Sequence, residues 1–157
     1  MASNWGLFLP ILLFISINEC STFNCVSCMS KEYEYFWNTL RGRWLKPREF
    51  SESCNDGVSP GSSLSSISCP SVCVTIQEQY KLLGKSETGF TRGCFDNLVI
   101  PGFNRSTVTR DNWLTKDGCH DYRDGLSLFA DRDTSSQIDM TVCTCYGENC
   151  NTPIVEQ

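Results

Sequence analysis

The sequence predicts a small all-β domain that is rich in disulfides. Eleven cysteines occur among 157 residues, a density that is typical of secreted scaffolds with small cores. Short runs that alternate apolar and polar residues are separated by segments rich in Gly, Ser and Pro, as expected for strands joined by turns. The formal net charge of -5 argues against a nucleic-acid partner, because such partners require a basic surface.

The first twenty residues have the pattern of a signal peptide. An apolar run from Leu7 to Ile17 is too short to cross a bilayer and contains no Lys or Arg. Cleavage is expected near Cys20 or Ser21, and removal of residues 1–20 changes the cysteine count from 11 to an even 10. A buried or anchored amino-terminal helix is the alternative.

Residues 21–157 are expected to form a single secreted domain. The segment 56–68, DGVSPGSSLSSIS, is predicted to be a flexible loop because Ser, Gly and Pro disfavour regular structure. The closing CNTPIVEQ lacks the hydrophobic tail that a glycolipid anchor requires. We therefore expect no transmembrane segment in the mature chain, with a glycolipid-anchored cell-surface form as the alternative.

Two segments have the alternation of half-buried strands. Residues 72–77 alternate apolar and polar side chains, and FTRGC at 90–94 can return antiparallel after LLGKSETG. This pattern predicts a hairpin with a polar tip. In the second segment Ile138, Met140 and Val142 share one face, which predicts a central strand directly before the last cysteines.

The cysteine-containing motifs at the two ends of the mature chain resemble one known family. The opening FNCVSC and the closing CTCYGENCN, with Asn151 directly after the last cysteine, resemble the lymphocyte-antigen-six/urokinase-receptor (Ly-6/uPAR) family. The motifs CVSCMSKEYEYFW, CVT, RGC and GFN are similar to its invertebrate odorant-response branch. The resemblance implies a three-finger, snake-toxin-like domain with extended loops over essentially the whole mature chain. Its fingers would lie within 25–69, 73–94 and 119–143.

Spacing alone leaves the pairing of the ten cysteines open, but the family's order of pairing implies five disulfides. They are Cys25–Cys73, Cys28–Cys54, Cys69–Cys94, Cys119–Cys143 and Cys145–Cys150. Each would contribute about 2 to 4 kcal/mol by restricting the unfolded chain. Stabilising disulfides are expected because a flattened three-finger shape buries little apolar surface. Thr144 separates two cysteines that are often adjacent in the family, so the loop geometry is expected to differ.

The resemblance implies a binding module and not an enzyme. Members of the family act on receptors or ion channels, including in neurons, and the odorant-response branch implies chemosensory signalling. The expected partner is therefore the extracellular part of a membrane receptor or channel. No cofactor, metal or small-molecule substrate is expected.

One string is compatible with catalysis. GCHDY at 118–122 places His120 beside Asp121, and secreted calcium-dependent phospholipases use a helical His-Asp pair. Those enzymes also have a paired-cysteine motif before the His and a Gly-rich calcium loop upstream, which this sequence lacks. His120 is moreover the single histidine, so a hydrolase is the weaker hypothesis.

Three groups of residues are candidates for contact with a partner. The preferred group is the tip of the second finger, with Lys81, Leu82, Leu83, Gly84 and Lys85. The second surrounds Trp44 with four cations, Arg41, Arg43, Lys46 and Arg48, although a solvated loop is the favoured interpretation. The third is the aromatic group Tyr33, Tyr35, Phe36 and Trp37, which is expected to cover the first finger's own core.

A glycosylation site is expected at Asn104. Asn104, Arg105 and Ser106 form an acceptor sequon, and the preceding Pro101 and Gly102 favour an exposed turn. A sequon that the secretory route leaves unused is the alternative.

Overall fold

The fold is organised around a six-stranded sheet. The computed structural model describes residues 22–55, 63–82, 84–130 and 138–152. The sheet has the strand order β3-β2-β6-β5-β8-β7, and only the β2–β3 pair is parallel. Its strands are β2 Cys28–Met29, β3 Glu49–Phe50, β5 Cys73–Leu82, β6 Lys85–Cys94, β7 Gly118–Tyr122 and β8 Asp139–Cys145. The expected signal peptide, residues 1–20, lies outside the described residues.

The central hairpin is formed by β5 and β6, as predicted. Its second strand is longer than FTRGC, because Leu82 pairs with Lys85 and the register continues to Cys73 opposite Cys94. The turn is therefore short and contains Gly84, whose φ of 81° favours a residue without a side chain. Most of LLGKSETG, predicted as the tip, thus belongs to the two strands.

The predicted alternation of the last strand is confirmed. Met140, Val142 and Thr144 of β8 are buried, whereas Asp139 is exposed on the other face. The strand lies between β5 and β7, so it is central, as expected.

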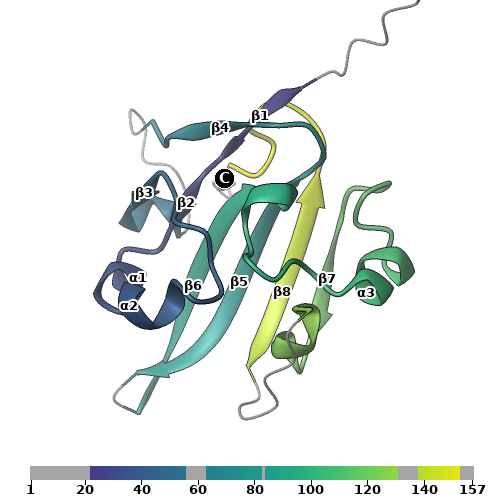
Figure 1. Cartoon of the computed structure of the whole chain (residues 1–157). Helices are drawn as coiled ribbons and strands as arrows, with labels where there is room; N and C mark the ends of the chain where they lie inside the picture. The colour runs from purple at the N-terminus through teal and green to yellow at the C-terminus, as the bar shows by residue number, and fades with distance from the viewer. Residues whose placement is uncertain (1–21, 56–62, 83, 131–137, 153–157) are drawn as a thin grey trace, which may run out of the picture.

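A second, two-stranded sheet lies across one end of the large sheet (Figure 1). It pairs β1 Phe23–Val26 with β4 Ser66–Cys69 in antiparallel register. The prediction of a flexible loop over 56–68 is therefore wrong for Ser66–Ser68, because the backbone of β1 supplies hydrogen-bond partners and serines fit the exposed positions of β4. Residues 56–62 of that segment lie outside the described residues.

The fingers, and the segment between the second and third of them, contain short helices that the sequence did not predict. They are α1 Glu32–Tyr35, α2 Trp37–Leu40, η1 Glu52–Cys54, η2 Phe95–Asn97, α3 Arg105–Arg110 and η3 Gly125–Leu128. The chain from η2 to α3 passes in front of the sheet, together with η3 (Figure 1). Within the described part of the chain, no helix is long and apolar enough to cross a membrane.

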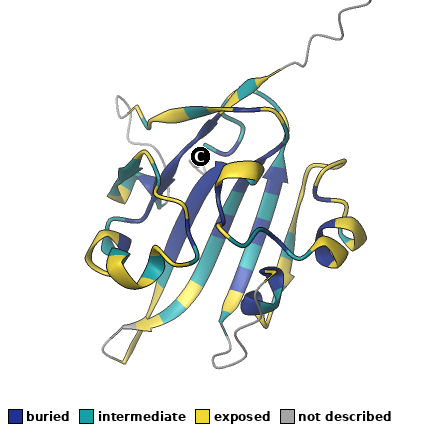
Figure 2. Ribbon diagram, viewed as in Figure 1, coloured by how far each residue is buried: buried dark blue, intermediate teal, exposed yellow. Residues whose placement is uncertain are grey.

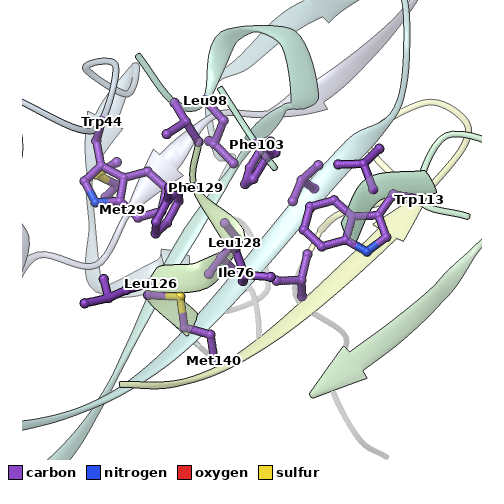
Figure 3. Close-up of a cluster of buried hydrophobic side chains, with 14 of the residues drawn as sticks. Met29, Trp44, Ile76, Leu98, Phe103, Trp113, Leu126, Leu128, Phe129 and Met140 are labelled. Atoms are coloured by element: carbon purple, nitrogen blue, oxygen red, sulfur yellow. The ribbon is translucent and has the colours of Figure 1, made fainter. Parts of the chain in front are cut away.

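The hydrophobic core lies between these segments and the sheet (Figures 2 and 3). Trp113 is completely buried and packs edge-on against Phe103, with 5.2 Å between the ring centroids. From the sheet, Ile76 and Met140 complete the same cluster. The small all-β, disulfide-rich class is confirmed, but the expectation that it buries little apolar surface is wrong. Trp44 and the buried residues of 98–113 and 126–129 cover one face of the sheet.

Trp44 belongs to this core and does not lie on a contact surface. Its exposed fraction is 5%, and its ring meets that of Phe129 edge-on at 5.4 Å. An isolated bridge to Val99 holds the backbone of Trp44 against the segment that follows the second finger. The prediction that Trp44 contacts a partner is therefore wrong, because its apolar ring is already buried among the side chains of the domain.

The disulfides join the roots of the fingers. The structure contains Cys25–Cys73, Cys28–Cys54, Cys69–Cys94, Cys119–Cys143 and Cys145–Cys150. These pairs coincide with those that the family resemblance implies. Cys25, Cys69, Cys73 and Cys94 form a buried cluster of their own. Covalent links and apolar packing therefore hold the same end of the sheet.

Truncation of Trp44 is expected to destabilise the fold strongly. Trp44→Ala should lower the free energy of unfolding by about 3 to 5 kcal/mol, because it leaves a cavity in the core. Urea unfolding with intact disulfides would measure the change. The matched control is Leu45→Ala, since Leu45 is 41% exposed, and its effect should stay within about 0.5 kcal/mol. Equal effects of the two variants would contradict the buried position of Trp44.

The disulfide pairs predict a simple result for peptide mapping. In a non-reduced tryptic digest, the peptide that ends at Lys31 should be linked to the peptide 49–81. That peptide should also be linked to the peptide 93–105, so the three form one species. A separate species should link 117–123 to 133–157. Mass spectrometry before and after reduction would identify both species. Any peptide that connects one species to the other would contradict the pairing.

Candidate functional site

The outer end of the β5–β6 hairpin carries the preferred contact residues. Lys81 and Lys85 are both exposed, and neither forms an ion pair with a described residue. Lys81 pairs with Ser86, whereas Lys85 pairs with Leu82. Because paired residues share a face and adjacent residues alternate, the two lysines point to opposite faces of the hairpin. The side chain of Leu82 and the whole of Leu83 lie outside the described residues.

Lys81 lines a groove at the outer end of the hairpin, whereas Lys85 does not belong to its lining. This tip groove has a volume of about 580 Å³ and combines an exposed cation, an exposed carboxylate and an aromatic ring. Its lining residues are Gln79, Tyr80, Lys81, Ser86, Ile138 and Asp139. Partial burial is the main cause that raises the pKa of Tyr80, so its hydroxyl remains protonated and can donate a hydrogen bond.

Sequence reasoning placed Lys81 at this site but missed the other five lining residues, Gln79, Tyr80, Ser86, Ile138 and Asp139. They come from β5, from β6 and from the segment at the start of β8, and the register that pairs Gln79 with Asp139 becomes visible only in the fold. The alternation of β5 and β8 was the available signal, but it does not specify which strand pairs with which.

The basic segment of the first finger is divided between core and surface. Arg43 is half-buried, and its guanidinium lies 5.0 Å from the centre of the Phe129 ring. Arg41, Lys46 and Arg48 are exposed, in agreement with a solvated loop. Trp44 lies between these exposed cations in the sequence, but its ring is buried and cannot contact a partner.

The aromatic group is also divided. Tyr33 is buried, and Trp37 packs edge-on against Phe50 at 5.5 Å, so these two cover the first finger as expected. Tyr35 and Phe36 instead are 80% and 45% exposed. The aromatic run therefore contributes two residues to the fold and two to the surface.

His120 and Asp121 do not form a catalytic pair. They are neighbours on β7, so their side chains point to opposite faces, whereas the hypothesis requires a helix that directs both into one site. Asp121 accepts a hydrogen bond from the Thr141 hydroxyl at 2.6 Å. Among the described residues, no group of three or more His, Cys, Asp or Glu side chains could hold a metal ion.

Asn104 directly precedes α3, in the segment whose apolar side chains pack on the sheet. Its Oδ1 accepts a hydrogen bond from the backbone N–H of Ser106 at 3.1 Å. The residue is half-buried and belongs to the lining of a second groove, beside α3. The sequon is thus placed away from the tip of the second finger.

The partly buried carboxyl group of Glu78 lies on β5, between the tip groove and the roots of the fingers. The Tyr33 hydroxyl donates to Glu78 Oε2 at 2.9 Å. Tyr33 reaches Glu78 by lying directly over Gly89, where a Cβ would be only 2.1 Å from the hydroxyl oxygen. Burial raises the pKa of Glu78, against the opposing effects of the Tyr33 hydrogen bond and the Arg43 charge.

Glu78 is expected to make stability depend on pH. Its pKa is higher in the folded than in the unfolded chain, so its contribution is complete at low pH and is lost as the pH rises through the folded pKa. Glu78→Gln keeps an oxygen that can accept from Tyr33 and removes the charge. The variant should therefore gain stability relative to the original protein between pH 4.5 and 7, as measured by urea unfolding. A difference that is independent of pH would contradict this assignment.

Comparison with known proteins places the disulfide frame in a family. No curated protein and no solved structure matches the chain. A family model described as Caenorhabditis elegans ly-6-related protein matches residues 28–152. The matched region runs from the second cysteine of the frame past its last cysteine, and it includes most of the first finger, the second and third fingers and the tip groove. The chain therefore belongs to the Caenorhabditis elegans ly-6-related protein family.

Proposed function

We propose that this module is secreted and binds the extracellular part of a membrane receptor or ion channel. Two features support the proposal: the expected signal peptide at residues 1–20 and a disulfide frame suited to an oxidising compartment. Chemosensory neurons are the proposed setting, in line with the resemblance to the odorant-response branch. A glycolipid-anchored form of the same module is the alternative.

The observation that carries the proposal is the tip groove with its exposed lysine. The groove lies beside the turn at the outer end of a rigid hairpin, and exposed residues held near such turns are typical of recognition sites. Lys81 has no ionic partner among the described residues, and Tyr80 offers a ring and a hydroxyl in the same groove. A partner surface that presents a carboxylate beside an apolar side chain fits this combination.

The groove predicts different effects for the two lysines of the tip. Lys81→Glu should weaken binding about tenfold or more, because it places like charges opposite each other. Lys85→Glu introduces the same charge change on the opposite face of the hairpin and should have a smaller effect. Fluorescently labelled protein, titrated on dissociated nematode neurons in flow cytometry, would measure both.

Two controls make this comparison decisive. Lys116→Glu changes an exposed lysine outside the tip groove and should bind as the original protein does. Urea unfolding should give similar stability for all three variants, since each residue is exposed. Binding that is unchanged by Lys81→Glu would exclude the tip groove as the contact site.

A further inference from the structure

A groove beside α3 is larger and more apolar than the tip groove. It has a volume of about 710 Å³, and we call it the α3 groove. Its lining includes six apolar residues, Phe95, Pro101, Phe103, Val108, Leu114 and Ala130. Leu114 is 42% exposed, so part of this apolar surface is open to water. This open part of the lining can pack against the apolar face of a bound group.

The sequon itself contributes to the lining of this groove. Asn104 and Arg105 both line it, and Ser106 completes the acceptor sequence. The Asn104 carboxamide carries two N–H groups, and Nδ2 donates to the Ser127 carbonyl at 3.4 Å. This bond uses one of the two protons, which leaves the other to be replaced. The atom that would carry a glycan is therefore held beside the groove.

We propose that Asn104 carries an N-linked glycan whose first N-acetylglucosamine packs into the α3 groove. In the transfer, the bond from Asn104 Nδ2 to the sugar C1 forms as the bond from C1 to a lipid diphosphate breaks. The lipid diphosphate leaves, and Nδ2 loses one proton. The donor is the lipid-linked oligosaccharide of the secretory route, so the inference rests on the proposed secretion.

The chemistry of the groove fits an amino sugar attached at its edge. A pyranose ring presents C–H groups that can pack on Phe95 and Leu114, and hydroxyl groups that can bond to Arg105 or Thr109. Covalent attachment raises the effective concentration of the sugar at the groove, so weak contacts are sufficient. The glycan would cover apolar surface on the α3 side and leave the tip of the second finger open.

The experiment compares four forms of the full chain, secreted from animal cells that make only oligomannose glycans: the original protein, the same protein after endoglycosidase H, and the variants Ser106→Ala and Ser106→Thr. Intact mass should show one glycan, and peptide mapping should place it on Asn104. Endoglycosidase H leaves a single N-acetylglucosamine and should leave the melting temperature unchanged. Ser106→Ala, which abolishes the sequon, should lower the melting temperature by about 3 °C. Ser106→Thr keeps the sequon and should retain both glycan and stability.

A double-mutant cycle separates packing in the groove from loss of the serine hydroxyl. Leu114→Ser should lower the melting temperature by more in the glycosylated protein than in the Ser106→Ala background. Leu45→Ser is the matched control, because Leu45 is 41% exposed and lies outside the α3 groove. Its effect should be the same in both backgrounds. Equal effects of Leu114→Ser in the two backgrounds would overturn the packing of the sugar in the groove. An unmodified Asn104 on a secreted chain would overturn the glycan and would leave the proposed receptor binding intact.

Discussion

The buried guanidinium of Arg92 holds the roots of the fingers together. It donates to the backbone carbonyls of Cys54, Asn55 and Asn151 and to the Thr75 hydroxyl, at distances of 2.8 to 3.1 Å. Because a buried cation is costly unless its donors are satisfied, these segments are held in one arrangement. The same guanidinium lies 5.3 Å from the centre of the Phe90 ring. One side chain of β6 thereby links the first finger, the second finger and the carboxyl-terminal segment.

The Asn151 side chain completes this link from the other end of the chain. Its Oδ1 accepts from the Val26 N–H at 2.9 Å, and its Nδ2 donates to the carbonyls of Val26 and Val74. The carboxamide thus connects β1 of the small sheet to β5 of the large one. Asn151 directly follows Cys150, which is bonded to Cys145, so a covalent constraint fixes the residue that makes these hydrogen bonds. The disulfides and the polar network therefore support each other.

Local patterns in the sequence were sufficient to predict the strands that pair with their neighbours. The alternation of residues 138–142 and the hairpin of the second finger could be predicted because apolar side chains on one strand face must share a core. The position of Trp44 could not be predicted in this way. Its ring is buried by Phe129, which lies far along the chain, and the basic residues around it made the segment look like an exposed loop. The α3 segment was missed because it is short and Val108 is its one buried apolar residue, which is too little for a helical repeat of apolar side chains.

The tip groove depends on the first finger although the first finger does not line it. Tyr33 of α1 contacts Tyr80 of the groove, with 6.0 Å between the ring centroids, and donates its hydroxyl proton to Glu78. Since Tyr33 lies over Gly89, its side chain is held between α1 and the β5–β6 hairpin. The position of the Tyr80 ring therefore reflects how the first finger is packed. Variation at Lys81 can change the charge of the contact surface without disturbing this arrangement, whereas variation at Tyr33 would alter both the packing and the shape of the groove.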